Sequence, residues 1–189
     1  MKKVNYVKEK IIAVTTDLIQ SSSGKIEEIT TRMIAEQAGV GIGLINYHFE
    51  SKDQLIEICV QRIISNVIAS FRPEVSSELN PIERLKIVAK LVIDFLLANP
   101  SVSRISIVGD YNNPKIQDNT MKTMVGFSNS LVNYSCSDAE KKILLFSLTS
   151  ILQAAFLRKD ISKECFGFDF NKKVERDNFI DLNIDKLFR

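Results

Sequence analysis

The chain has 189 residues, a mass of 21.4 kDa and a formal net charge of +2, so it can bury a substantial core in one or two domains. Its composition, 45% hydrophobic and 25% charged, is ordinary for a soluble globular protein. The most apolar stretch, residues 143–157, is too short to span a bilayer and is interrupted by four polar residues. No hydrophobic stretch follows the first lysines, which argues against a signal peptide.

Hydrophobic spacing and capping signals predict four helices in the first part of the chain. In chain order they are a helix over residues 5–21, a short helix opened by Thr30, a second short helix that ends at Phe49, and a long helix from Ser51 towards Phe71. Thr30 is a good N-cap, because its hydroxyl can accept a hydrogen bond from an amide of the first turn. Gly39 can adopt a positive φ, which ends the first short helix and turns the chain. Ser51 and Gln54 have the spacing of a capping box.

Two short helices joined by a tight glycine turn form a helix-turn-helix, and its second helix has the size that enters the major groove of DNA. Val40, Ile45 and Phe49 recur at helical spacing here, so we expect them to face inward. The outward face is then made of Ile42, Gly43, Leu44, Asn46 and Tyr47. Lys52 follows in the first turn of the next helix, where a cation and free backbone amides together suit a phosphate.

The charge of residues 1–60 does not favour DNA binding, because seven Lys or Arg stand against eight Asp or Glu. The distribution of the cations compensates in part. Four lysines crowd the first ten residues, and Arg32 and Lys52 flank the predicted recognition helix. The motif therefore outweighs the count, and we expect modest affinity for DNA of random sequence.

Beyond a domain boundary near Arg72 and Pro73, four more helices are predicted. They begin at Asn80, Ser101, Pro114 and Ser137, and they end before Pro100, at Gly109, near Tyr134 and near Arg158. The first opens on an N-cap, a proline and an acid, and the last opens on a capping box. The segment from Asp160 mixes charges with aromatic residues, and we expect it to fold back as a short helix. Nothing alternates with period two, so the predicted fold class is all-α, with about nine helices.

The helix predicted over residues 138–158 is apolar on most of its circumference, so it must be covered on nearly all sides. One helical domain covers one face, and a second copy of the chain is the simplest cover for the other. The candidate dimer-interface residues are Leu148, Ile151, Leu152 and Ala155. A small-molecule pocket is also expected in this half, lined by Phe95, Met124, Phe127, Leu131 and Phe146, although aromatic residues at helical spacing more often belong to a plain core.

The segment from Ile29 to Leu55, ITTRMIAEQAGVGIGLINYHFESKDQL, resembles the N-terminal domain of the TetR family of bacterial transcriptional regulators. The resemblance rests on the spacing of Thr30-Thr31-Arg32, Ile34-Ala35, Ala38-Gly39-Val40, Tyr47-His48-Phe49 and Ser51-Lys52. It implies an all-α homodimer with a three-helix DNA-binding domain over residues 1–50, a connecting helix over 51–71, and an effector-binding and dimerisation domain over 72–189. It also implies that residues 115–134 and 138–158 pair with their copies in a four-helix bundle.

The residues that the resemblance assigns to DNA are Thr30, Thr31, Arg32, Gly41, Ile42, Gly43, Leu44, Asn46, Tyr47, His48 and Lys52. Two of them depart from the pattern of the family. Gly41 stands where Ser or Thr is usual, so a cap and a phosphate contact are missing. Asn46 replaces a tyrosine and suits a bidentate hydrogen bond to adenine, whereas Ile42 and Leu44 suit thymine methyl groups.

Arg32 and His48 each have two interpretations. Arg32 matches an arginine that we expect on guanine or on a phosphate. His48, the only histidine, matches a phosphate-contacting histidine, and packing on Phe49 at the helix end is the alternative. One histidine makes no metal site. The glycine run 39–43 follows a helix and lacks the third glycine of a dinucleotide loop, so neither a metal nor a cofactor is expected.

The function implied by the resemblance is that of a sequence-specific transcriptional regulator, a repressor that a small, apolar effector releases from operator DNA. Three cysteines far apart in the sequence suit a reducing cytoplasm, and buried packing is favoured over redox sensing at Cys59. No catalytic constellation is visible, so no enzyme is expected. The alternatives are a small helical enzyme, or an interaction protein that reuses the fold without binding an operator.

Overall fold

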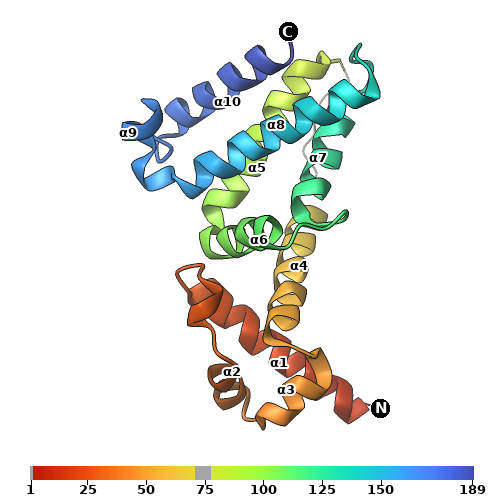
Figure 1. The fold of residues 1–189 in the computed structure, drawn as a ribbon, viewed down its shortest axis with the longest axis vertical. Coiled ribbons are helices and arrows are strands. Elements are labelled where there is room, and N and C mark those ends of the chain that lie inside the picture. Colours follow the sequence, from red (N-terminus) through yellow and green to blue (C-terminus); the bar gives the residue numbers. More distant parts are fainter. Residues whose placement is uncertain (1, 71–77) are drawn as a thin grey trace. The chain divides into compact units, whose positions relative to one another are not determined.

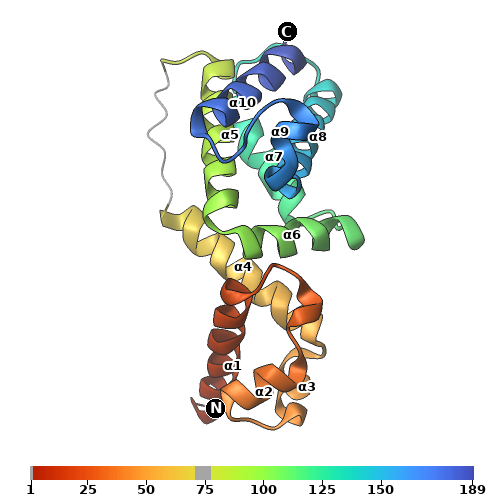
Figure 2. The ribbon, with the colours of Figure 1, turned by 90° about the vertical axis from the view of Figure 1, so that its left-hand side faces the viewer.

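The chain folds into two compact helical units, each with its own apolar core (Figure 1, Figure 2). The computed structural model describes the backbone of residues 2–70 and 78–189 and the side chains of residues 6–66 and 78–189. Unit 1 comprises Met1–Arg72 and Asn99–Gly109, and unit 2 comprises Pro73–Ala98 and Asp110–Arg189. The boundary predicted near residues 72 and 73 lies outside the described residues. The described part of the chain contains no strand, which confirms the all-α class.

Unit 1 is built from α1 (Lys2–Ser21), the 3-10 helix η1 (Ile26–Glu28), α2 (Thr31–Ala38), α3 (Ile42–Phe49), α4 (Lys52–Ser70) and most of α6 (Pro100–Asn112). α1 packs against α2 and α4, and α3 packs against the same two helices. The predicted caps form: Met33 N donates to Thr30 Oγ1 at 3.2 Å, and Gln54 N donates to Ser51 Oγ at 3.1 Å. Gly39 ends α2 in the left-handed conformation, with φ 62°. These local bonds fix the helix-turn-helix.

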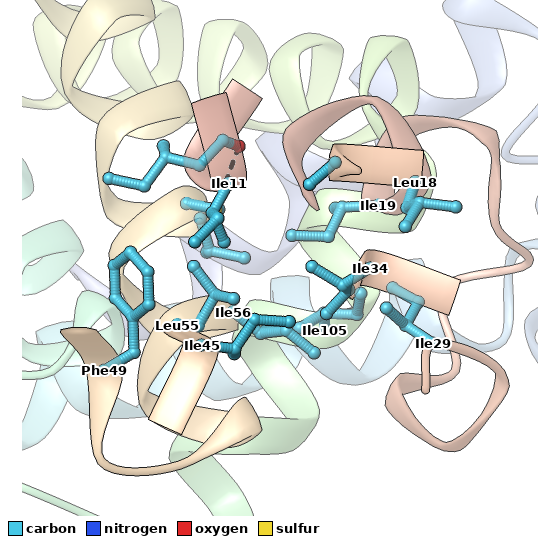
Figure 3. Packing of buried hydrophobic residues seen from close by; sticks show 14 of the residues in the cluster. Ile11, Leu18, Ile19, Ile29, Ile34, Ile45, Phe49, Leu55, Ile56 and Ile105 are labelled. Atoms are coloured by element: carbon cyan, nitrogen blue, oxygen red, sulfur yellow. Dashed lines mark hydrogen bonds between the residues drawn. The ribbon is translucent and has the colours of Figure 1, made fainter. Parts of the chain in front are cut away.

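The core of unit 1 consists mainly of branched aliphatic side chains, with the ring of Phe49 at one edge of the cluster (Figure 3). Ile45 and Phe49 of α3 are 0% and 1% exposed, so their predicted inward orientation is confirmed, and Val40 is half-buried. Ile11 of α1 and Leu55 of α4 are fully buried in the same cluster. Each such side chain contributes about 1.5–3 kcal/mol by leaving water. α3 is therefore anchored to the core of unit 1 through its buried side, and its opposite side remains exposed to solvent.

Unit 2 is built from α5 (Pro81–Ala98), α7 (Asn119–Ser130), α8 (Asp138–Leu157), the 3-10 helix η2 (Lys159–Ile161), α9 (Ser162–Phe166) and α10 (Lys173–Leu187). α5 packs against α7, α8 and α10, and α8 packs against α7 and α10. The predicted starts of α5 and α8 are confirmed, because Glu83 N donates to Asn80 Oδ1 at 3.0 Å and Glu140 N donates to Ser137 Oγ at 3.2 Å.

Three predicted boundaries are wrong. α6 continues through Gly109 to residue 112, because a single glycine is tolerated inside a helix. α7 begins at Asn119, five residues after the predicted Pro114, because Asp118 supplies the N-cap by accepting a hydrogen bond from Met121 N at 2.9 Å. It ends at Ser130 and does not extend to the predicted Tyr134. Among the described residues, no single helix is long and apolar enough to cross a membrane, and α5 and α6 meet that length and composition only as a bent pair.

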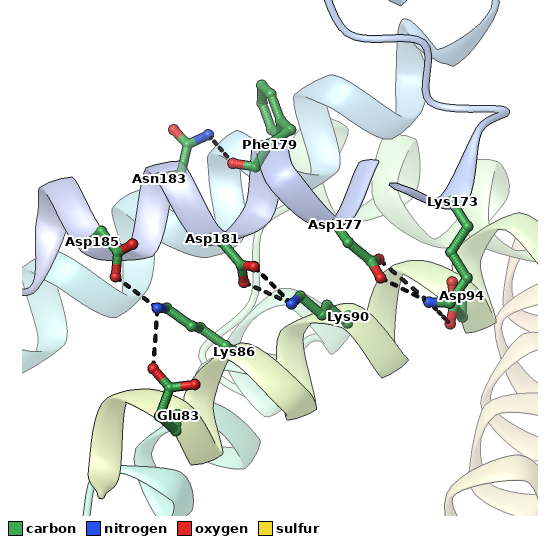
Figure 4. A network of polar contacts seen from close by, with 10 residues as sticks. All are labelled: Glu83, Lys86, Lys90, Asp94, Lys173, Asp177, Phe179, Asp181, Asn183 and Asp185. Carbon is green, nitrogen blue, oxygen red and sulfur yellow. Dashed lines mark hydrogen bonds and ion pairs between the residues drawn. The ribbon is translucent and has the colours of Figure 1, made fainter. Parts of the chain in front are cut away.

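The segment after residue 160, expected to form a short helix, contains α9 and the longer α10. α10 is a 15-residue helix that completes the core of unit 2 with Phe179, Ile180 and Ile184. Charged side chains join it to α5 in a row (Figure 4). The contacts are Lys86–Asp185 (2.8 Å), Lys90–Asp181 (2.8 Å), Lys173–Asp94 (3.4 Å) and Arg176–Asp94 (2.8 Å). Spacings of about four residues on each helix place these charges on facing sides.

Candidate nucleic-acid interface

The outward face of α3 is exposed and carries no charge. Its members are Ile42 (47% exposed), Gly43, Leu44 (43%), Asn46 and Tyr47 (76%). An α-helix turns by about 100° per residue, so these positions fill one arc, and the buried Ile45 and Phe49 lie on the opposite arc. The predicted orientation of α3 is confirmed. It leaves two aliphatic side chains, a bare backbone position, an amide and a phenol for contact.

Gly41 and Glu50 flank the two ends of α3. Gly41 is the N-cap, with φ −74° and ψ 147°, and no side chain bonds to the first amides of the helix, as the sequence predicts. Glu50 follows the other end with φ 57° and ψ −47°, and Ser51 N donates to Phe49 O across it. Such a three-residue turn at a non-glycine residue costs about 1–3 kcal/mol. Because of this turn, only Glu50 and Ser51 lie between the end of α3 and the start of α4.

Two lysines of α1 lie beside the ends of the recognition segment. Lys8 Nζ lies 5.6 Å from the centroid of the Phe49 ring, at the end of α3. Lys10 Nζ lies 3.7 Å from the position that a Cβ on Gly39 would take, in the turn before α3. Sequence reasoning counted both only as N-terminal charge, because their place depends on how α1 packs across the motif. They supply cations on either side of a neutral helix.

The two cations predicted to flank α3 both have protein partners. Arg32 Nε donates to Glu36 Oε1 at 2.9 Å, and their side chains are 82% and 63% exposed. An exposed pair within one helix is worth only about 0.3–0.5 kcal/mol, so Arg32 can exchange Glu36 for DNA at little cost. Lys52 is half-buried, and its Nζ donates to Ile26 O at 3.1 Å. It therefore ties η1 to the start of α4.

The remaining predicted contact residues are only partly available. His48 is half-buried, with ring centroids 5.1 Å from Tyr47 and 5.9 Å from Phe49. The packing interpretation of His48 is thus realised, and its phosphate contact stays a prediction. Thr30 uses its hydroxyl as the cap of α2, and Thr31 is half-buried in the first turn. Within the described ranges, no group of three or more His, Cys, Asp or Glu residues is placed to hold a metal ion.

Known proteins share both this segment and the architecture. Residues 25–59, which contain η1, α2, α3 and the start of α4, match the family model described as bacterial regulatory proteins, tetR family. A transcriptional regulator from Rhodococcus sp. RHA1 has a TM-score of 0.65 at 17% identity over 95% of both chains. A TetR-family transcriptional regulator from Haemophilus influenzae has a TM-score of 0.58 at 18% identity over 98% of both chains. The chain has the helix-turn-helix domain and the fold of the TetR family.

Curated relatives match the chain over about half of their own length. The nucleoid occlusion factor SlmA of Mannheimia succiniciproducens is 26% identical over 98 residues, which is 52% of this chain and 45% of the relative. SlmA of Vibrio cholerae is 28% identical over 104 residues, 55% of this chain and 52% of the relative. The chain thus matches only about half the length of these relatives.

The residues predicted to line an effector pocket lie in different environments. Met124 and Phe127 of α7 and its C-cap residue Leu131 are buried in the core of unit 2, and Phe95 of α5 is half-buried. Phe146 does not join them, because it is 51% exposed on the outer side of α8. The structure brings Met124, Phe127 and Leu131 together in one core and leaves Phe146 outside it.

A polar network that sequence reasoning missed lies at the N-terminus of α7. Thr120 donates to Asp110 Oδ2 from both N (2.8 Å) and Oγ1 (2.9 Å). Gln153 Nε2 donates to Thr120 Oγ1 at 2.9 Å. The hydroxyl proton of Thr120 is donated to Asp110, so the hydroxyl oxygen of Thr120 can only accept, and it accepts from the side-chain amide of Gln153. This bond orients the Gln153 amide, and its Oε1 is buried without a hydrogen-bond partner. Burial raises the pKa of Asp110, and the hydrogen bonds from Thr120 oppose that shift. The only sequence signal was a glutamine within an apolar helix.

The predicted dimer-interface residues need correction. Leu148, Leu152 and Ala155 are 0–2% exposed in the core of one chain, so their side chains are not free to meet a partner. Ile151 is half-buried against the same core. The exposed apolar residues of α8 are instead Ile143 (66%) and Phe146 (51%). Periodicity alone could not separate these sets, because α8 is apolar nearly all round.

Proposed function

We propose that this chain is a sequence-specific DNA-binding transcriptional regulator, a repressor released by a small effector. The observation that supports this most directly is the exposed face of α3, which is held from behind by Ile45 and Phe49. A rigid short helix presented by a glycine turn is the element that reads base edges in the major groove. Lys8 and Lys10 beside it provide charge for phosphates without placing a cation on the reading face.

The test is binding of the full chain to genomic fragments, followed by fluorescence anisotropy on the fragments retained. We expect selective binding to a few sequences and weak binding to random DNA. Lys10→Ala should weaken both alike and lower the slope of log K against log salt by about one unit, because one phosphate contact is lost. Equal affinity for every fragment would remove the proposal and favour an interaction protein or a helical enzyme.

A homodimer is part of this proposal. Between residues 143 and 157 the outer face of α8 contains no charged residue and consists of Ile143, Phe146, Ser147, Ser150, Ala154 and Leu157. The inner face of the helix is already buried in its own unit. Small residues at the centre of the outer face allow a second copy of α8 to approach closely, with the larger side chains at its ends. This face replaces the predicted set as the candidate interface.

The effector is proposed to bind in unit 2 and to be mainly apolar. The half-buried Phe95 of α5 offers apolar surface, and the unpartnered Oε1 of Gln153 offers one hydrogen-bond acceptor on α8. A buried acceptor left unsatisfied costs about 1–3 kcal/mol, so a ligand that donates to it gains from the pre-oriented amide. A thermal-shift screen comparing apolar compounds with and without one N–H or O–H group tests this. Stabilisation by the fully apolar compounds alone would contradict the polar contact.

A second candidate function follows from the similarity to SlmA, a nucleoid occlusion factor. The similarity extends beyond the helix-turn-helix, which makes this candidate specific. A protein that marks the nucleoid needs sites spread over the chromosome, whereas a local regulator occupies few sites near promoters. Mapping the chromosomal sites of the protein in its own cells separates the two.

A further inference from the structure

The chemistry of α3 bears on which bases it reads, and this rests on the proposed function. Guanine is read in the major groove mainly by Arg or Lys, adenine by Asn or Gln, and thymine by apolar contact with its methyl group. Residues Ile42–Phe49 contain no Lys and no Arg. Asn46 is the exposed amide, and Ile42 and Leu44 are exposed aliphatic side chains.

The order of these residues around the helix places Gly43 at the centre of the face. At about 100° per residue, Ile42 and Asn46 lie on one side of Gly43, and Tyr47 and Leu44 lie on the other. A Cβ added to Gly43 would meet no protein atom within 4 Å, so the space in front of it is open. Asn, Ile and Leu are shorter than Arg and reach base edges only when the helix backbone comes close. A glycine at the centre permits that approach.

We infer that each operator half-site is A·T-rich beneath α3, with thymine methyl groups received by Ile42 and Leu44 and an adenine bound by the amide of Asn46. Arg32 is not part of the face of α3, because it stands in the first turn of α2. Recognition then depends on methyl groups and one amide, with the phosphates held separately from α1.

The experiment selects binding sites for the full chain from random duplexes, then replaces single thymines of the selected half-site by deoxyuridine. This removes one methyl group and leaves base pairing unchanged. We expect about a four-fold loss of affinity at each thymine that meets an aliphatic side chain, the effect of one buried methyl. In Ile42→Ala or Leu44→Ala the corresponding substitution should have no effect. Met33→Ala, an exposed apolar residue of α2, is the matched control and should retain the full loss.

Two further variants test the amide and the close approach. Asn46→Ala should lose discrimination at one A·T pair by about 5- to 150-fold. Gly43→Ala should weaken binding to the selected site more than binding to random DNA, because the added methyl group blocks the close approach. It should do so although alanine is more favourable than glycine in a helix by about 1 kcal/mol. A selected half-site rich in G·C, or thymine replacement without effect on the wild type, overturns this inference and leaves the proposed function standing. Failure to select any sequence overturns both.

Discussion

At residue 41 a glycine begins α3 where a hydroxyl side chain would accept hydrogen bonds from the helix amides. Its φ of −74° is open to any residue, and a Cβ there would meet nothing within 4 Å. Gly41→Ser should therefore raise the free energy of unfolding by about 0.5–1 kcal/mol, from a new cap and a less flexible unfolded chain. Urea denaturation measures this. Gly39→Ala is the matched control and should destabilise, because its φ of 62° strains any other residue.

Cys59 gives the stability a dependence on alkaline pH. The thiol is fully buried, donates to Ile12 O at 3.6 Å, and burial raises its pKa from 9.0 to about 11. Because the pKa is higher in the folded state, the contribution of the Cys59 thiol to the free energy of unfolding is complete below pH 9. It is lost as the pH rises towards 11. The loss should be on the order of 2–3 kcal/mol, and absent in Cys59→Ala. The thiol also stays protonated near neutral pH, which argues against redox sensing.

Unfolding free energies of wild type and Cys59→Ala, measured in urea from pH 8 to 11, give this difference directly. Other groups titrate in the same range, and the subtraction removes them. Cys165→Ala, at an exposed cysteine, is the control and should follow the wild-type profile. Parallel profiles for all three proteins would contradict the assigned cause.

Among the elements, α10 depends on one buried cation more than on its surface ion pairs. Arg176 is 8% exposed and donates to Phe170 O at 2.7 Å and to Asp94 Oδ1 at 2.8 Å. Arg176→Ala leaves both acceptors short of a donor and should cost about 2–3 kcal/mol in urea unfolding. Lys173→Ala removes the ion pairs of a 60% exposed side chain with Asp94 and Asp177 and should cost less than about 1 kcal/mol. Equal costs would show that burial does not distinguish the two.

The elements also show what the sequence can and cannot predict. Caps at Thr30, Ser51, Asn80 and Ser137 were predicted correctly, because each is a hydrogen bond between residues three apart. The boundaries of α6 and α7 were not predicted correctly. Gly109 is tolerated inside α6, and α7 begins after the N-cap Asp118 instead of at Pro114. α10 was underestimated, since its apolar face becomes evident only against α5 and α8.

The candidate site follows the same division. The face of α3 could be predicted, because Ile45 and Phe49 define its inner side by helical period alone. The positions of Lys8 and Lys10 beside it could not, since they depend on how α1 packs. The inner and outer sides of α8 needed three neighbouring helices to be told apart.

For the whole molecule, a charged substitution should have different effects on the two sides of α8: loss of the dimer on the outer side and unfolding on the inner side. Phe146→Glu places a charge on the outer face and should convert a dimer of twice 21.4 kDa into a folded monomer. Leu148→Glu buries a charge in the core and should unfold the chain, because a buried unpaired carboxylate costs several kcal/mol. Light scattering and circular dichroism separate the outcomes. A dimeric Phe146→Glu protein would exclude this face as the interface.

The proposed release of DNA by an effector requires effector binding in unit 2 to be coupled to DNA binding by unit 1. A symmetric dimer reads two half-sites only when its recognition helices lie about one DNA turn apart, roughly 34–36 Å. α4 follows α3 directly in the chain, so a tilt of α4 changes that spacing. A ligand in unit 2 shifts the equilibrium only by its different affinity for the two spacings.

Operator DNA must then weaken effector binding by the same factor by which effector weakens DNA binding. A coupling of about 1–3 kcal/mol, typical of such systems, corresponds to about a 5- to 150-fold change in each. Calorimetry of the effector with the free protein and with the operator complex measures one factor, and anisotropy of the operator measures the other. Gln153→Met should weaken the effector in both titrations equally, because it removes a contact common to both states. Identical effector affinity with and without operator would exclude release by this route, even for a protein that binds its operator well.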